Sequence, residues 1–200
     1  MAELYPGYDV LAKWRSPSFD DATRDVLRGR LERVPQRSFL SEEEWRLLDA
    51  VVARLIPQPD RAEPIPITPC IDSMLAANQG DGYRREGVPV LREAWRQGLA
   101  GLMAEAQAEH AKGFDALSVE EQDALLTRIQ RGESSNPGWD GLPAGHFFTD
   151  MLLRTVVGIY YAHPDAWSEI GFGGPASPRG YVRLGFGGLD PWEAVEARDR

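Results

Sequence analysis

The chain has 200 residues, of which 42% are hydrophobic and 26% charged, a balance typical of a folded globular protein. Its 31 Asp and Glu outnumber 22 Lys and Arg, and the net charge of −9 argues against partnership with nucleic acid or an anionic membrane surface. The one cysteine, Cys70, excludes an internal disulfide. We expect a single soluble domain whose core needs no cross-links.

The first part of the chain predicts an arm followed by two helices. Residues 1–19 have no periodicity, and a helix is expected over about 20–34, ended by a proline. Ser41 and Glu44 have the spacing of a capping box, which predicts the start of a second helix. Apolar residues at steps of three and four then give this helix one buried face. They are Trp45, Leu48, Val52 and Leu55.

The middle of the chain predicts a loop and two more helices. The proline-rich segment 57–69 is expected to be extended, and Thr68 to cap a short helix running to about Asn78. A long helix is expected over about 89–111. Two glycines within it, Gly98 and Gly101, indicate the close approach of a neighbouring helix.

The last predicted helices complete an all-α fold. Ser118 and Glu121 form a second capping box, and about residues 144–162 form the most apolar helix, which belongs at the centre of a bundle. We therefore expect a bundle of about six helices with an irregular Gly/Pro/aromatic C-terminal arm. The expected divisions are an N-terminal arm and helix (1–38), a helical core (39–162) and the arm (163–200).

Several aromatic residues lie in segments that cannot form amphipathic elements. Two interpretations remain open: these rings cover the protein's own bundle, or they anchor a partner as interface hot spots. The residues are Trp139, Trp167, Phe172, Tyr181, Phe186 and Trp192.

Candidate catalytic and metal-binding residues are few. His146 and Asp150 stand four residues apart on one helical face, a spacing that can share a metal, but a metal site needs three or four ligands. Cys70 lies near a helix start, where the helix dipole lowers a thiol pKa, yet no base can be placed beside it. The sequence therefore predicts no catalytic, cofactor or metal site. An enzyme using His146, Asp150 and Cys70, and a self-associating structural protein, are the alternatives.

The last third resembles the subunit 3 family of gluconate 2-dehydrogenase. The resemblance rests on FFTDMLLRTVVGIYYAHPDAWSEIGFGGPASPRGYVRLGF, in which an apolar helix leads to a Tyr-rich exit and then to W-x-x-I-G-F-x-G-P. Upstream, FLSEEEWRLLDAVVARLIPQPD is similar to an earlier motif of the family, so the resemblance covers roughly residues 39–190. It carries no catalytic motif.

This resemblance implies a helical accessory subunit that supports maturation, export or stability of a flavin-dependent sugar or alcohol dehydrogenase. The expected partners are a large flavoprotein subunit, which holds FAD, and a cytochrome c subunit, which holds haem c. Many relatives have a twin-arginine leader, whereas residues 1–21 match no signal peptide. We expect a cytoplasmic product that reaches the periplasm only if its partner carries the export signal, and no direct membrane insertion.

Overall fold

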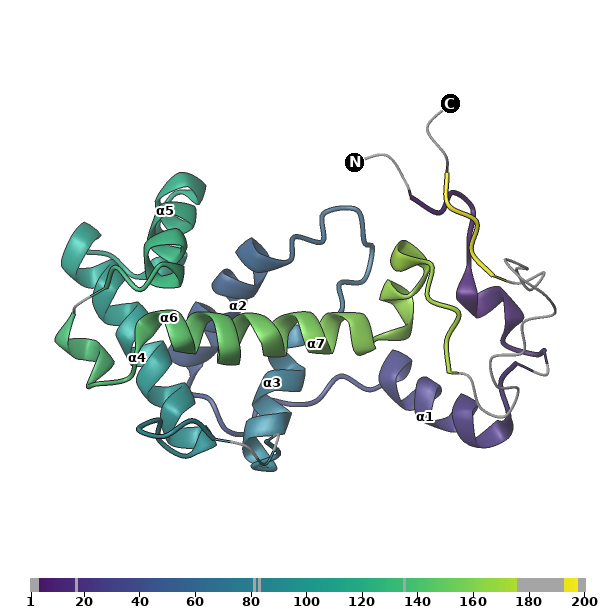
Figure 1. Ribbon diagram of the computed structural model, residues 1–200, viewed down its shortest axis with the longest axis horizontal. Coiled ribbons are helices and arrows are strands. Elements are labelled where there is room, and N and C mark those ends of the chain that lie inside the picture. The colour runs from purple at the N-terminus through teal and green to yellow at the C-terminus, as the bar shows by residue number, and fades with distance from the viewer. Residues whose placement is uncertain are drawn as a thin grey trace. The chain divides into compact units, whose positions relative to one another are not determined.

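The computed structural model describes residues 4–16, 18–80, 82, 84–134, 136–175 and 193–197 (Figure 1). All regular elements among these residues are helices, and no strand occurs within the described ranges, so the predicted all-α class is confirmed. Contacts divide the chain into two compact units. The terminal unit combines Met1–Val34 with Tyr160–Arg200, and the central unit is Pro35–Ile159.

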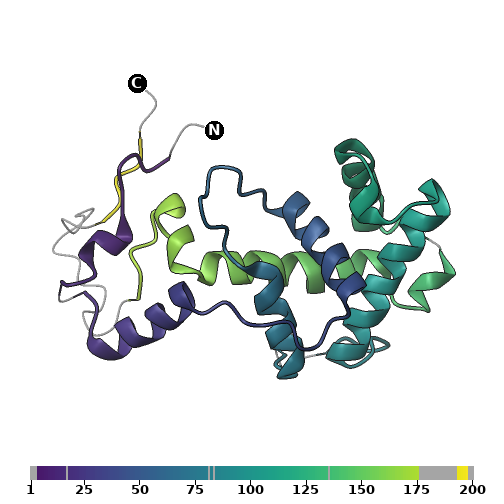
Figure 2. The same cartoon turned by 180° about the vertical axis from the view of Figure 1, so that it is seen from behind.

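The central unit is built from helices α2 to α6 and the greater part of α7, and two 3-10 helices, η2 and η3, connect them (Figures 1 and 2). Helix α2 packs against α3, α4 and α5, while α4 and α5 both pack against the π-helix η4 that follows α6. The bounds are α2 Glu42–Leu55, α3 Ile67–Ala76, α4 Leu91–His110, η2 Phe114–Ala116, α5 Val119–Gln130, η3 Pro137–Trp139, α6 Ala144–His146, η4 Phe147–Leu153 and α7 Arg154–Ala162.

Both predicted capping boxes are confirmed at the starts of α2 and α5. In each, the serine hydroxyl accepts the backbone N–H of the glutamate three residues on, and the glutamate carboxylate accepts the serine N–H. The prediction for Thr68 is wrong. Pro66 occupies the N-cap position of α3, and Thr68, inside the first turn, donates its hydroxyl hydrogen to Asp49 at 3.1 Å. A tertiary partner outcompetes the local capping bond.

The predicted apolar helix exists, but its middle is a π-helix. Residues 147–153 have the wider π geometry, and α-helix precedes and follows them without a break. Side-chain periodicity over seven residues cannot separate the two forms, so the sequence did not reveal it. Such insertions are frequent at functional sites. Phe147, Phe148 and Leu152 of this stretch are buried.

The predicted close approach to α4 is confirmed at both of its glycines. A Cβ atom on Gly98 would overlap the ring of Phe147, and one on Gly101 would overlap the indole of Trp139. The Phe147 ring also lies edge-on to Trp95, with 5.7 Å between ring centroids. Two bulky rings therefore rest directly on the α4 backbone, which no other residue type at positions 98 and 101 permits.

The terminal unit joins the first and last segments of the chain around one small core. Its elements are η1 Val10–Lys13, α1 Asp21–Glu32, η5 Pro164–Ala166 and η6 Ser168–Ile170. Val10, Phe19, Leu27 and Trp167 are all buried together. The predicted N-terminal arm is thus part of a core, and residues 164–170 of the predicted irregular arm form two 3-10 turns. Single turns show no periodicity, which is why the sequence did not predict them.

A buried carboxylate anchors the chain segment that leads into α2. Asp72, on α3, is fully buried, and it accepts hydrogen bonds from the backbone N–H groups of Ser38 at 2.6 Å, Phe39 at 3.0 Å and Leu40 at 2.7 Å. Burial by itself raises the pKa of Asp72. The hydrogen bonds from these residues outweigh burial, and the pKa lies below its usual value.

Replacing this carboxylate should destabilise the chain in a pH-dependent way. The native pKa is lowered, so the stabilisation is fully present above the unfolded-state pKa of about 3.9 and is lost as the pH falls through the native pKa. We expect Asp72→Asn to lower the free energy of unfolding by about 1–3 kcal/mol at pH 7, and the gap to the unaltered protein to shrink below about pH 4. Urea titrations at both pH values measure this.

The exposed Asp60 provides a matched control. Asp60→Asn should leave the free energy of unfolding nearly unchanged at both pH values. An Asp72→Asn protein as stable as the control at pH 7 would contradict the anchoring role.

Candidate functional site

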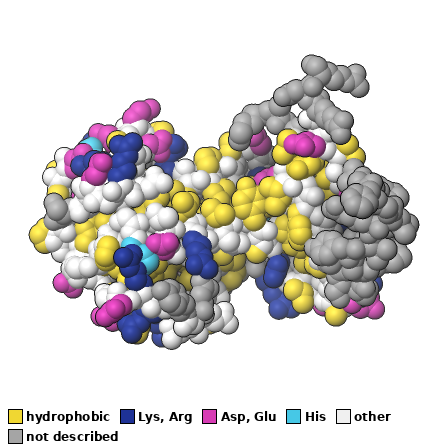
Figure 3. All heavy atoms as spheres, in the orientation of Figure 1, with side chains coloured by type: hydrophobic (Ala, Val, Ile, Leu, Met, Phe, Trp, Pro, Cys, Tyr) yellow, Lys and Arg dark blue, Asp and Glu magenta, His cyan; other side chains and the backbone are white. Residues whose placement is uncertain are grey.

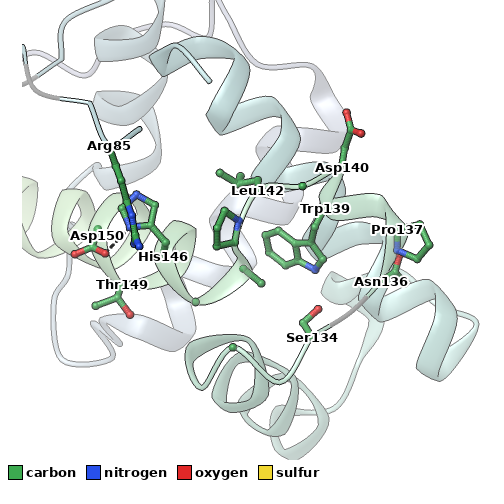
Figure 4. Close-up of a pocket in the computed structure, with 15 residues that line it drawn as sticks. Arg85, Ser134, Asn136, Pro137, Trp139, Asp140, Leu142, His146, Thr149 and Asp150 are labelled. Carbon is green, nitrogen blue, oxygen red and sulfur yellow. Dashed lines mark hydrogen bonds and ion pairs between the residues drawn. The ribbon is translucent and has the colours of Figure 1, made fainter. Parts of the chain in front are cut away.

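Two hollows in the structure are candidate sites, one in each unit. The first is a polar pocket of about 730 Å³ in the central unit, between the loop that follows α5 and the start of the α6–η4 stretch. Figure 4 shows the side chains around it, including Arg85, Trp139 and Thr149. The second is an apolar groove of about 540 Å³ in the terminal unit.

His146 and Asp150 form the ionisable pair of the polar pocket, as their spacing predicts. His146 Nδ1 lies 2.6 Å from Asp150 Oδ2, shown as a dashed line in Figure 4. The carboxylate holds the imidazole in one orientation, which a base or a metal ligand needs. A metal site needs more ligands, however. Among the described residues, no group of three or more His, Cys, Asp or Glu side chains is arranged to hold a metal ion.

Trp139 forms one wall of the pocket and is held from several sides. Its indole N–H donates to Glu105 Oε1 at 2.9 Å, and its carbonyl accepts from Gln97 Nε2, also at 2.9 Å. Ser134 donates to the same Glu105 oxygen. Glu105 is nearly buried, and Arg128 Nη2 lies 3.8 Å from its second oxygen. The indole is therefore a fixed structural wall.

Cys70 does not have the environment of a nucleophile. The sequence allowed for a lowered thiol pKa at a helix start, but burial raises the pKa of Cys70 instead. A raised pKa leaves the thiol protonated at neutral pH, and the thiol is a far weaker nucleophile than the thiolate. The interpretation of Cys70 as a small, half-buried apolar side chain is therefore favoured.

The apolar groove of the terminal unit is built around Trp167. The indole N–H donates to the carbonyl of Tyr161 at 2.9 Å, and the Phe172 ring lies edge-on to the indole with 5.2 Å between centroids. Helix α1 supplies the opposite wall with Val26 and Leu27. Leu27 and Trp167 are buried, whereas Val26, Tyr161 and Phe172 remain 58%, 40% and 38% exposed.

The polar groups along the groove are already bonded within the chain. Asp20 accepts the backbone N–H of Thr23 at 2.7 Å, and its hydrogen bonds to Thr23 hold the pKa of Asp20 below its usual value. Arg30 donates to the carbonyl of Ala162 at 2.8 Å. His163 caps η5, and its Nε2 lies 2.9 Å from the Arg30 carbonyl oxygen. What the groove presents to a ligand is therefore mainly hydrocarbon.

Exposed apolar side chains concentrate in the terminal unit. Of nine large hydrophobic residues exposed in the described part of the chain, seven belong to this unit although it is the smaller one. Figure 3 shows hydrophobic side chains reaching the surface on one face. The seven are Leu4, Val26, Val34, Tyr161, Ile170, Phe172 and Val195. Val26, Tyr161 and Phe172 lie together at the groove, and contiguous exposed apolar side chains are typical of contact sites for other molecules.

The six aromatic residues predicted to bind a partner are placed as follows. Trp139 and Trp167 are 4% and 3% exposed, so both pack on the chain itself, the first of the two interpretations that the sequence left open. Phe172 is partly exposed at the groove. Tyr181, Phe186 and Trp192 lie outside the described residues. Partner binding by this set stays a prediction. The sequence missed Val26 and Tyr161, because helical periodicity does not show which apolar residues remain uncovered.

Comparison with known proteins identifies one family. The family model described as gluconate 2-dehydrogenase subunit 3 matches residues 42–174, two thirds of the chain. No curated protein and no solved structure matches the chain. In the residues that the structure describes, no helix combines the length and the apolar character that crossing a membrane requires.

Adding a methyl group beneath Trp139 should disturb the wall of the polar pocket. Gly101→Ala places a Cβ where the indole lies, so we expect the free energy of unfolding to fall by about 1–3 kcal/mol and the tryptophan fluorescence to change. The matched control is Gly29→Ala in α1, where a Cβ meets nothing within 4 Å. This substitution should raise stability by about 0.5–1 kcal/mol. Equal effects of the two would contradict the described packing.

Proposed function

Because the chain belongs to the gluconate 2-dehydrogenase subunit 3 family, we propose that it is a non-catalytic accessory subunit whose apolar groove binds the large, flavin-dependent subunit of a dehydrogenase complex. The observation that carries this proposal is the concentration of exposed apolar side chains in the terminal unit. The family match includes the wall formed by Tyr161 and Phe172 and ends at residue 174. Helix α1, the opposite wall, precedes it.

The chemistry of the groove supports a protein partner. Its polar groups already have partners in the chain, so an incoming apolar side chain displaces water without leaving a donor or acceptor unsatisfied. Aromatic residues at the centre of an interface carry much of the binding energy. Micromolar affinity requires about 8 kcal/mol, which a few such rings can supply.

Binding of this kind stabilises the partner through linkage. A subunit that binds the folded but not the unfolded form of the large subunit adds about 2.7 kcal/mol to its stability at a concentration one hundred times Kd. This is the physical content of a role in maturation or stability. In the proposed complex, FAD belongs to the large subunit and haem c to a cytochrome subunit. The chain is made in the cytoplasm, and its partner carries the signal for any export.

The alternative function is an enzyme using the polar pocket, and one observation favours it. His146 is oriented by Asp150 at the edge of a cavity and beside a π-helix. A general base needs this orientation, but a covalent mechanism also needs an activated nucleophile. The raised pKa of the Cys70 thiol opposes that role. The structure therefore offers one component of a catalytic site.

A charge placed in the groove should abolish binding of the large subunit. We expect Val26→Asp to lower the affinity at least tenfold, because the carboxylate would be desolvated against apolar atoms. Since Val26 is 58% exposed, the free energy of unfolding should change little. Co-purification of the co-expressed large subunit and a titration of the isolated proteins measure the effect.

The matched control is Val119→Asp, at a residue of the central unit that is 49% exposed and does not line the groove. It should leave the affinity unchanged, as should His146→Ala in the polar pocket. These substitutions test the groove without unfolding the protein. Truncation after Ala162 would not, because it would remove the buried Trp167 and unfold the terminal unit. Full binding by Val26→Asp refutes the proposed groove, and loss of binding in His146→Ala favours the polar pocket instead.

A further inference from the structure

The polar pocket is complete within the central unit, and part of its wall is already satisfied. Its volume of about 730 Å³ is in the range of small-molecule sites. Trp139 and Ser134 both donate to Glu105. Asn136 donates to a carbonyl of α4 at 3.2 Å and accepts the N–H of Gly138 at 2.8 Å. These side chains therefore shape the pocket and leave the binding of a ligand to its other residues.

Backbone donors at one edge of the pocket have no acceptor. This edge is the start of α6, which continues through η4 into α7 without a break. Pro143 occupies the N-cap position and provides no side-chain cap, and the first hydrogen bond of the helix runs from the N–H of Phe147 to the Pro143 carbonyl at 3.0 Å. The N–H groups of Ala144, Gly145 and His146 make no hydrogen bond within the described part of the chain. Ala144 is buried and the other two are half-buried, and buried donors are normally paired.

The guanidinium of Arg85 adds positive charge to the same pocket. It makes no hydrogen bond or ion pair with the residues that the structure describes. Figure 4 shows the Arg85 side chain extending to the side of the pocket that His146 and Asp150 form. Two carboxylates line the pocket as well. Asp150 is turned to His146 Nδ1 at 2.6 Å, and Figure 4 shows the Asp140 carboxylate directed away from the other labelled side chains. The groups left without a partner are therefore mainly donors.

We propose that the polar pocket binds the oxyanion group of a small molecule, a carboxylate or a phosphate, between the N–H groups of residues 144–146 and the guanidinium of Arg85. The free N–H groups and the positive partial charge of a helix start both favour an anion. A guanidinium presents paired donors that match two oxygens of either group. The pocket is larger than a single ion, so it has room for the rest of the ligand. This site belongs to the isolated chain and does not depend on the proposed function.

Titrations of the isotope-labelled, isolated chain with sodium acetate and with inorganic phosphate test the site. At constant pH and ionic strength, we expect saturable shifts of the Gly145 and His146 amide signals in the NMR spectrum. The anion that saturates at the lower concentration distinguishes a carboxylate from a phosphate ligand. The start of α5 is the internal control, because the N–H of Glu121 already donates to Ser118. Shifts that do not saturate with either anion, or equal shifts at Glu121, overturn the proposal.

Two arginine substitutions make the test specific to the pocket. Arg85→Gln should weaken binding of the preferred anion about fivefold, the effect expected for an ion contact at an exposed site. Arg46→Gln is the matched control, since Arg46 is also exposed and in the central unit but does not line the pocket. It should leave the affinity unchanged. Full affinity in Arg85→Gln, or equal losses in both variants, overturns the assignment of the site to Arg85. Neither result bears on the groove, whose test is binding of the large subunit.

Discussion

The central unit depends on two aromatic rings that lie directly on the backbone of α4. Phe147 and Trp139 occupy the space that side chains at positions 98 and 101 would fill. This contact brings the α6–η4 stretch and the loop before it against α4. The rings also contact each other, with 6.0 Å between their centroids. Aromatic pairs of this kind add about 0.5–1.5 kcal/mol beyond the area that they bury. The polar pocket takes its shape from the same contact, since Trp139 is one of its walls.

The terminal unit depends on one aromatic ring, the indole of Trp167. It brings together segments from both ends of the chain and has few buried side chains, so Trp167 has to serve several purposes. The indole fills the core beside Val10 and Phe19, bonds the exit of α7 through its N–H group, and forms the floor of the groove. A core this small leaves apolar side chains uncovered around it. These uncovered apolar side chains are the physical basis of the proposed binding role.

The two candidate sites differ in the chemical groups that they present to a ligand. The polar pocket offers one oriented imidazole, hydroxyl groups, carboxylates and a guanidinium, but no group of three His, Cys, Asp or Glu side chains among the described residues is arranged to hold a metal ion. The groove offers hydrocarbon whose neighbouring polar groups are already satisfied. An accessory subunit needs the second kind of surface, because its contribution is the burial of apolar area on a partner. Family membership and the distribution of exposed side chains thus favour the same function.

Local sequence patterns were enough to predict the features whose hydrogen bonds or contacts join residues close together in the chain. Each capping box needs only a serine and a glutamate three residues apart, and each was present as predicted. The sequence also predicted the close approach at Gly98 and Gly101, because glycine destabilises a helix interior and its presence there indicates that a neighbour occupies the space of a side chain. The aromatic residues of the arm were recognised as unusual, yet their sequence context could not show which of them are buried.

By itself, the sequence determined the helical class, the two helix starts marked by capping boxes and the family, since each depends on residues close together in the chain or on composition. Tertiary structure alone decided the rest. It joined the two ends of the chain in one unit, placed Thr68 against Asp49, made the middle of the apolar helix a π-helix, and left Val26, Tyr161 and Phe172 uncovered. These outcomes depend on which side chains pack or form hydrogen bonds with one another in the folded chain. The residues concerned lie far apart in sequence, so local patterns do not show them.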